Sequence, residues 1–288
     1  MQLRPSNLVV SCLAALAVGA AAHADYAYAK AGVRIIGQRR VESERFSTSQ
    51  IGTAASDQDQ YGHSASSSAL SLGNQLIADM FTNTSSAGFA ESYASLASVG
   101  SDVVIRRRDG TGAGSIITVT ALVTPRLLTT FSGAPASWDE PFMYGTMQRN
   151  MSVVDCNGVS QSIGGSSVES MADGTTGDPT GMAYALTFQV RASEAFSISL
   201  SMSSAAESSS SAPYAGTATA TIASATLTLG AASSSFTGDG ARMAFILPEG
   251  YTADSASLGI VDNMVIVPGP GAIALIGMVR PAGRRRRR

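Results

Sequence analysis

The sequence predicts an all-β protein, an antiparallel β-sandwich of jelly-roll type, between two distinctive terminal segments. Three observations predict this fold class. Apolar residues alternate with small or polar ones, clusters of turn-forming residues separate these stretches, and only 14% of residues are charged while small side chains are abundant. A chain of 288 residues that is 44% hydrophobic can bury a large core, so disorder is not expected.

The first 24 residues have the three parts of a secretory signal. Arg4 gives a positive start, residues 8–22 form an apolar run, and Ala22 and Ala24 occupy the positions that signal peptidase reads. Cleavage is therefore expected before Asp25, with signal peptidase and the secretion translocon as partners. An N-terminal membrane anchor is the alternative, although the run is shorter than the ~20 residues of a membrane span.

Residues 25–88 have weaker patterning than the rest of the chain, which favours a mobile arm or edge strands. Within this segment, a short helix is possible over residues 69–81. The residues at helical spacing there are Leu72, Leu76, Ile77 and Met80. The surrounding serines favour strand or loop instead.

Regular alternation begins near Val103 and predicts a β-sandwich domain over residues 89–263. The expected apolar positions are Ile117, Val119, Ala121 and Val123; Met143, Met147, Met151 and Val153; Met182, Tyr184, Leu186, Phe188 and Val190; and Phe196, Ile198, Leu200 and Met202. Between Ile222 and Ala223 the apolar phase shifts by one residue. This shift predicts a β-bulge or a strand that crosses between sheets.

Turn-forming clusters separate the predicted strands. They lie at Asp109–Gly114, Gly133–Ala136, Asp155–Gly158, Asp173–Asp178, Ser208–Pro213 and Thr237–Gly240. The glycines of residues 110–114 indicate a hairpin loop. Residues 173–178 could offer oxygen ligands to calcium, but they lack the alternating acids of a dedicated calcium loop, so a simple turn is favoured.

The C-terminal segment, residues 264–288, joins three features in order. Pro268, Gly269 and Pro270 come first, then an apolar stretch over residues 271–279, then the five arginines Arg284, Arg285, Arg286, Arg287 and Arg288. The prolines interrupt a strand, the apolar stretch can enter a bilayer, and the arginines stay on the cytoplasmic side. A translocating chain would pause there with its body outside. A non-functional or plainly basic end is the alternative, because the apolar stretch is short for a membrane span.

In this order of motif, apolar stretch and basic stop, the chain resembles the PEP-CTERM proteins, whose tail is recognised and removed by an exosortase. The resemblance covers the leader and residues 250–288, with a Gly-Tyr-Thr and a Val-Asp-Asn segment before the motif. It departs at Gly269, where the family motif has Glu, and at Arg280 and Pro281, which interrupt the apolar stretch. The resemblance implies a secreted surface or extracellular-matrix protein of a bacterium, anchored transiently in the membrane. It also implies an exosortase-like protease as partner, and an association with extracellular polysaccharide and biofilm.

Charge and composition argue against several classes of function. Arg4, Arg280 and residues 284–288 hold seven of the 19 basic residues, and the rest of the chain is strongly acidic. An acidic body argues against binding to nucleic acid or to an anionic membrane surface. Lys30 is the only lysine, so the chain has no phosphate-binding loop of the Gly-rich, lysine-containing type.

Catalytic and metal-binding arrangements are few. When Cys12 and His23 leave with the leader, Cys156 and His63 are the only thiol and imidazole, which excludes an intramolecular disulfide and a multi-histidine zinc site. His63 lies in a polar stretch and is expected to be solvated, and Cys156 is expected to be a small buried apolar residue. We therefore expect no enzyme activity, no metal and no cofactor.

Two surface features leave alternatives open. Arg106 and Arg108 should share one face of a strand and Arg107 the other; edge-strand charges that block aggregation are favoured over contact with an acidic polysaccharide. Trp138, beside Asp139, is a weak ligand candidate because sugars stack on such rings, although packing under a sheet is favoured. The alternative function is therefore a secreted lectin-like or carbohydrate-active sandwich. A filament subunit that joins sheet edges is a third possibility.

Overall fold

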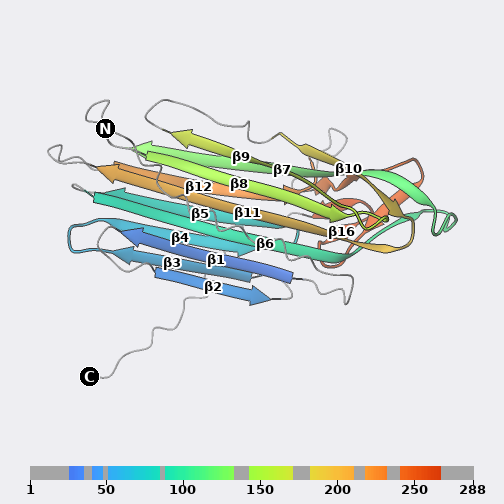
Figure 1. Ribbon diagram of the computed structural model, residues 1–288, viewed down its shortest axis with the longest axis horizontal. Coiled ribbons are helices and arrows are strands. Elements are labelled where there is room, and N and C mark those ends of the chain that lie inside the picture. The colour runs from blue at the N-terminus through green and yellow to red at the C-terminus, as the bar shows by residue number, and fades with distance from the viewer. Residues whose placement is uncertain are drawn as a thin grey trace, which may run out of the picture.

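The computed structural model describes residues 26–35, 41–47, 51–84, 88–132, 143–170, 182–210, 218–231 and 241–266, and every regular element within them is a β-strand. Two large antiparallel sheets pack face to face (Figure 1). This arrangement confirms the predicted antiparallel β-sandwich. The alternation of small and apolar residues with polar ones explains it, because each strand has one face for the core and one for water.

Sheet A has the strand order β2-β1-β6-β11-β8-β9, and β15 pairs with the end of β6. Its strands are β1 (Tyr26–Ile35), β2 (Val41–Ser47), β6 (Gly88–Arg107), β8 (Met143–Val154), β9 (Ser160–Ser170), β11 (Ala195–Ser210) and β15 (Tyr251–Asp254). Sheet A therefore draws strands from both halves of the chain.

Sheet B has the order β10-β7-β12-β5-β4-β3, and β14 pairs with β7. Its strands are β3 (Ile51–Gln58), β4 (Ser64–Ser71), β5 (Gln75–Thr84), β7 (Ile116–Ser132), β10 (Tyr184–Arg191), β12 (Ala218–Leu229) and β14 (Phe245–Ile246). A third, small sheet has the order β13-β17-β16, with β13 (Ala241–Met243), β16 (Ile260–Val261) and β17 (Met264–Ile266).

The core lies between the two sheets and follows the predicted alternation. Buried positions on β7, β8 and β11 are Ile117, Val119, Ala121 and Val123; Met143, Met147, Met151 and Val153; and Ile198, Leu200 and Met202. On β10, Phe188 and Val190 are buried, whereas Tyr184 and Leu186 pack against the core from half-buried positions. The predicted bulge is confirmed, since the register of β12 shifts just after Ile222 against both of its neighbours.

The possible helix over residues 69–81 is wrong. These residues span the end of β4, a tight turn and most of β5. Leu76, Ala78 and Met80 point into the core at a spacing of two, and Ile77 lies on the opposite face of the strand. The alternative that the surrounding serines favoured, a strand, is the one observed. The serine-rich β4 pairs with β5 along its whole length.

Residues 25–88 contribute both edge and interior strands. β2 and β3 are edges of sheets A and B, whereas β1 lies between β2 and β6, and β5 lies between β4 and β12. β1 can be an interior strand because its alternate residues Ala27, Ala29, Ala31, Val33 and Ile35 are all buried. Small side chains let β1 approach β3 and β4 of the facing sheet closely.

The glycine-rich turn after β6 is confirmed as a turn, but it is not a hairpin. It joins β6 of sheet A to β7 of sheet B, so it carries the chain from one sheet to the other. Asp109 closes this turn by accepting hydrogen bonds from the backbone N–H and the hydroxyl of Thr111. The predicted turn at residues 155–158 joins β8 to β9. Residues 208–210 instead continue β11, and the remaining turn clusters lie outside the described residues.

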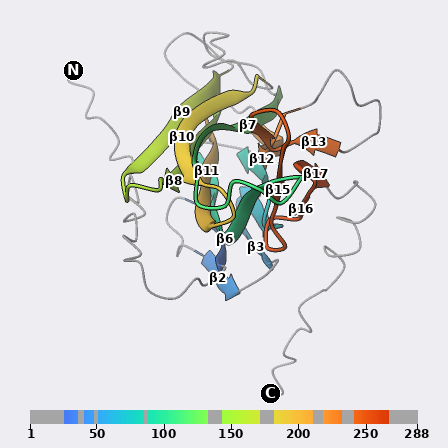
Figure 2. The same cartoon turned by 90° about the vertical axis from the view of Figure 1, so that its right-hand side faces the viewer.

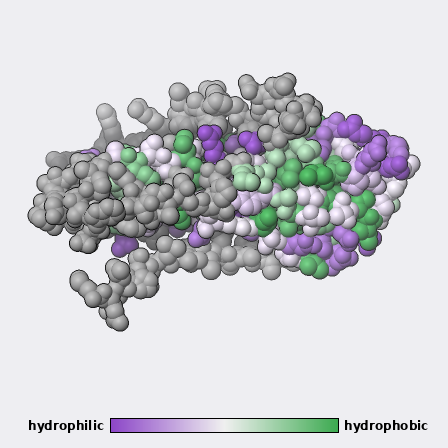
Figure 3. Space-filling model, turned by 90° about the horizontal axis from the view of Figure 1, so that it is seen from above, coloured by the Kyte–Doolittle hydropathy of each residue, from purple (hydrophilic) through white to green (hydrophobic). Residues whose placement is uncertain are grey.

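The two ends of the sandwich differ. β1, β5, β7 and β11 end, and β2, β6, β8 and β12 begin, at one end of the sandwich, on the left in Figure 1. The strands β13 to β17 lie at the opposite end, and Figure 2 looks on to them. Hydrophilic side chains also gather at this second end (Figure 3). The chain leaves β17 there, towards the residues of the C-terminal segment.

Candidate functional sites: the docked C-terminal strands and the outer face of sheet A

The residues predicted to carry processing or ligand binding lie outside the described residues. They are Ala22, Ala24 and Asp25 of the leader, Pro268, Gly269 and Pro270 of the motif, Arg284 to Arg288, Trp138, and residues 173–178. The first and the last of the described strands lie close to the two predicted cuts. β1 begins at Tyr26 and β17 ends at Ile266, so the seventeen strands of the described residues lie between the two predicted cuts.

The strands that precede the C-terminal segment are docked on β6 through Asp102. The Asp102 carboxylate accepts hydrogen bonds from the backbone N–H groups of Ala256 (2.8 Å) and Ser257 (3.0 Å), and from the hydroxyls of Ser255 and Ser257. Burial raises the pKa of this carboxyl, but the four hydrogen bonds outweigh burial and hold the pKa below its usual value. Asp102 therefore ties the turn after β15 to sheet A.

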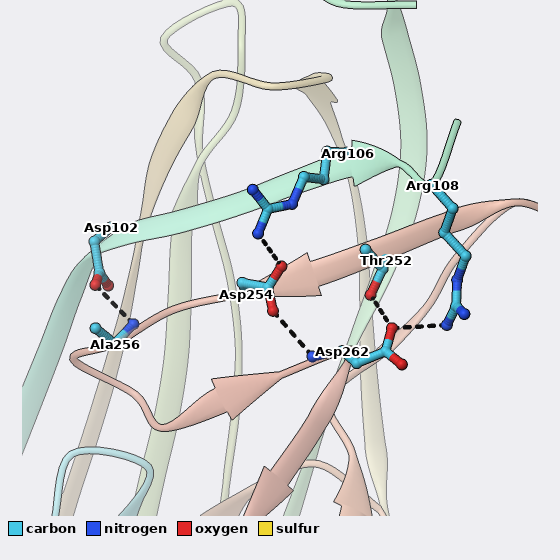
Figure 4. A network of polar contacts seen from close by, with 7 residues as sticks. All are labelled: Asp102, Arg106, Arg108, Thr252, Asp254, Ala256 and Asp262. Atoms are coloured by element: carbon cyan, nitrogen blue, oxygen red, sulfur yellow. Dashed lines mark hydrogen bonds and ion pairs between the residues drawn. The ribbon is translucent and has the colours of Figure 1, made fainter. Parts of the chain in front are cut away.

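Two arginines continue this attachment (Figure 4). Arg106 pairs with Asp254 at 2.5 Å, and Arg108 pairs with Asp262 at 2.7 Å. The alternation predicted for these arginines is confirmed, because Arg107 turns to Asp109 instead. The prediction of an edge strand is wrong: β6 lies inside sheet A, and its last residues pair with β15.

A two-residue turn places the carboxylate that Arg108 reaches. Asp262 and Asn263 both have positive φ, 51° and 66°, as a type I′ turn requires, and they connect β16 to β17. The Asn263 amide accepts a hydrogen bond from the backbone N–H of Phe245 and donates one to the Phe245 carbonyl. The Val-Asp-Asn segment is thus explained by a tight turn that fixes the small sheet to the buried Phe245.

Leu258 anchors the same region by packing. Its side chain is 1% exposed and lies over Gly100 of β6, where an added Cβ would come within 2.3 Å of it. Only glycine at position 100 leaves room for this close approach. The C-terminal strands are therefore held by both charge and apolar contact, and the chain leaves a firmly attached strand at Ile266.

The outer face of sheet A, which points away from sheet B, carries a row of ionisable groups. Arg34 of β1, Glu91 of β6, Glu207 of β11 and Tyr144 of β8 are successive cross-strand neighbours. The Tyr144 hydroxyl hydrogen-bonds with Glu207. Two carboxylates directly opposite each other on neighbouring strands are unfavourable for stability, so this row is one of the two candidate sites on this face.

The two glutamates of this row differ in their surroundings. Burial, and after it the charge of Glu91, raise the pKa of Glu207 to about 7, although Tyr144 and Arg34 act in the opposite direction. Burial and Glu207 together raise the pKa of Tyr144. Glu207 is consequently able to hold a proton near neutral pH.

An aromatic cluster lies along the β1–β2 side of the same face. Phe46 of β2 is the cross-strand neighbour of Tyr28, with ring centroids 4.9 Å apart, and its centroid lies 6.0 Å from that of Tyr26. Phe46 is 59% exposed, whereas Tyr28 is buried. Burial, and after it the carboxylate of Glu44, raise the pKa of the Tyr28 hydroxyl. The rings of Tyr26 and Tyr28 therefore support the exposed ring of Phe46.

Polar groups continue this cluster along β2. Glu42 forms an ion pair with Lys30 at 3.1 Å and accepts a hydrogen bond from the Tyr93 hydroxyl. The Tyr93 ring lies over Gly32, where a Cβ would come within 2.1 Å of it. Outer-face residues of β11 are mainly small, as the serines at 199, 201 and 203 show. The outer face of sheet A thus carries aromatic and acidic groups along β1 and β2 and serine hydroxyls along β11.

Two predictions about single residues need correction. His63 is 4% exposed, not solvated: its Nδ1 lies 2.9 Å from the Asp59 carboxylate, and its ring packs against Gly88. The β3–β4 turn folds back on itself, since Asp59 also accepts the His63 backbone N–H. Cys156 is half-buried in the β8–β9 turn, not part of the core, and it is a free thiol.

The remaining described residues offer neither a metal-binding cluster nor a membrane-spanning helix. No cluster of three or more His, Cys, Asp or Glu side chains that could hold a metal ion occurs among the described residues. Within the same residues, no helix has the length and apolar character to cross a membrane. Arg149 is buried inside the sandwich, where it donates hydrogen bonds to Ser167 and Tyr184 and lies 4.6 Å from the Tyr184 ring centroid.

Comparisons with known proteins give no family. No protein-family model matches the chain, and no curated protein matches it. Among solved structures, a study titled "Structural basis for the promiscuous specificity of the carbohydrate-binding modules from the beta-sandwich super family" supplies one match. That match has 11% identity, covers 70% of this chain and 84% of the other, and has a TM-score of 0.16. A structure of infectious bursal disease virus, Gx strain, matches with 10% identity, covers 88% of this chain and 68% of the other, and has a TM-score of 0.09. TM-scores this low carry no argument about fold or function.

Proposed function

We propose that this protein is exported, sorted by an exosortase-like protease and retained as a non-enzymatic component of the bacterial surface or extracellular matrix. One observation carries the proposal: a secretory-type leader over residues 1–24 precedes the described sandwich, and the motif from Pro268, the apolar stretch and the arginines follow it. Removal of the leader and of the residues from Pro268 onward would then leave all the described strands in place. The docked strands β15 to β17 favour this reading, because tension on the tail would be borne by a firmly attached element.

The proposal includes a jelly-roll connectivity for the central eight strands. Strands β5 to β12 divide into two four-stranded halves, β5-β12-β7-β10 and β6-β11-β8-β9. This order is what supports an eight-stranded jelly roll, to which β1 to β4 add two strands on each sheet. Jelly rolls are common in lectins, which agrees with the proposed association with extracellular polysaccharide.

The sorting role is tested by replacing the five arginines at 284–288 with serine. The tail should then lose its cytoplasmic stop, and membrane retention of the precursor should fall. Fractionation of cells that express the chain with its leader measures this directly. As a control, the half-buried serines at 199, 201 and 203 on the outer face of β11 are changed to alanine. Unchanged membrane association of the arginine variant would contradict the proposal.

A carbohydrate-active enzyme is the second candidate function, and the Glu91–Glu207 pair favours it. Glycosidases use two carboxyl groups whose environments push their pKa values apart, one as acid and one as base or nucleophile. Glu207, with its pKa raised to about 7, would be the acid and Glu91 the partner. Hydrolysis of a screened polysaccharide that is lost in both Glu91→Gln and Glu207→Gln would favour the enzyme; no hydrolysis on any would favour the matrix protein.

A further inference from the structure

An exposed phenylalanine at the margin of sheet A is held in a fixed position. Phe46 lies on the edge strand β2 with 59% of its surface exposed, and Tyr28 and Tyr26 support its ring from the neighbouring strand. Tyr28 is itself held in place by burial, since only 8% of it is exposed. A rigid aromatic ring with its outer side open to water offers an apolar surface at little cost in side-chain entropy.

Carboxylates lie in line with this ring. Glu42, Glu44 and Phe46 occupy alternate positions of β2, so they share one face at a spacing of about 6.6–6.8 Å. Glu42 and Glu44 are both exposed. Lys30 and Arg34 are the cations on the outer face of β1, and Lys30 is paired with Glu42. Together with Glu91 and Glu207, the carboxylates outnumber the cations among the described side chains of this face.

We propose that Phe46, Tyr28, Tyr26, Glu42 and Glu44 form a binding site for a polysaccharide built of amino sugars. This inference rests on the proposed function, because it names the site and the chemical class of the matrix polysaccharide. The C–H groups of a sugar ring would pack on Phe46, and an ammonium group would pair with Glu44 or lie over an aromatic ring. An anionic polysaccharide would be repelled by the carboxylates and by the acidic body.

Binding is measured by calorimetry on the exported protein with three probes: a chitosan oligosaccharide, a neutral cello-oligosaccharide and an alginate oligosaccharide. The chitosan probe should bind best and alginate least. Phe46→Ala should weaken chitosan binding about five- to tenfold, the worth of one aromatic contact. Glu44→Gln keeps the size of the side chain but removes its charge, so the preference for chitosan over the neutral probe should shrink.

Matched controls separate the site from general attraction to an acidic protein. Phe81→Ala removes a ring that is 37% exposed on the outer face of sheet B, and Glu249→Gln removes an exposed charge near the C-terminal strands. Both should leave chitosan binding unchanged. Equal losses in Phe46→Ala and Phe81→Ala, or tighter binding of alginate than of chitosan, would overturn the site. Absence of binding to all three probes would also overturn it. Export and sorting are tested separately by the masses of the native chain.

Discussion

At the scale of single residues, the positions that matter most are charged groups whose partners lie far away in sequence. Asp102 meets Ser255 to Ser257, and Glu91 meets Glu207. The sequence showed no local signal for either meeting, because cross-strand neighbours depend on strand order and register. Alternation along one strand did place Arg106 and Arg108 on a common face, since that property needs only a period of two. The prediction for His63 is wrong because a polar local sequence does not reveal that the turn brings the Asp59 carboxylate to the His63 Nδ1.

Asp102→Asn should destabilise the protein by about 1–2 kcal/mol, because the charge-assisted hydrogen bonds to the turn after β15 weaken at a partly exposed site. The pKa of Asp102 is depressed in the folded protein, so its contribution is complete above the unfolded pKa of about 3.9 and is lost as pH falls through the folded value. Urea unfolding at pH 7 and at low pH measures both effects. Glu249→Gln is the control, and equal stabilities of the two variants would contradict the role of Asp102.

Glu207→Gln should change how stability depends on pH. The folded pKa of Glu207, about 7, lies above the unfolded value of about 4.3, so the wild type loses stability as pH rises through this window. The variant should lack this loss and be more stable than the wild type at pH 8 by about 1–3 kcal/mol, with little difference near pH 4. Thermal unfolding across this range is the measurement. Parallel pH profiles for the two proteins would count against burial of Glu207 beside Glu91.

At the scale of elements, alternation was a good guide wherever strands have one buried face. It identified the inward positions of β7, β8 and β11, and the phase shift after Ile222 located the bulge in β12. It was a poor guide in β1, where small residues are buried on both faces of the strand. Ala29 on the inner face and Gly32 on the outer face differ little in hydrophobicity, so the sequence shows no clear alternation. The hairpin expected after β6 was wrong for a different reason, because a turn sequence does not reveal which sheet the next strand joins.

Leu258→Ala tests how the C-terminal strands are docked. Leu258 is buried over Gly100, so the substitution leaves a cavity between β6 and the β15–β16 turn and should cost about 2–5 kcal/mol. Val261→Ala is a matched control in the next strand, because Val261 is 61% exposed and should have an effect within about 0.5 kcal/mol. The stability of both variants is measured by denaturant unfolding, with proteolysis at the C-terminal strands as the probe. Similar losses in the two would show that the docking contact is not formed.

At the scale of the whole molecule, composition and patterning predicted the antiparallel sandwich, and the described strands supply its two sheets. The order of the strands was beyond the sequence, because pairing of β1 with β6, or of β5 with β12, joins segments that are distant along the chain. The molecule has one end where the chain leaves the docked β17 and an opposite end where β7 ends and β8 begins. If the tail is held at a membrane, that opposite end would face the surroundings.

The central claim is that both terminal segments are removed from an otherwise complete sandwich. Intact-mass measurement of the protein isolated from its host tests this claim most directly. The account predicts a chain that begins at Asp25 and that has lost Arg284 to Arg288 together with the apolar stretch before them. A native chain that extends from Met1 to Arg288 would contradict it.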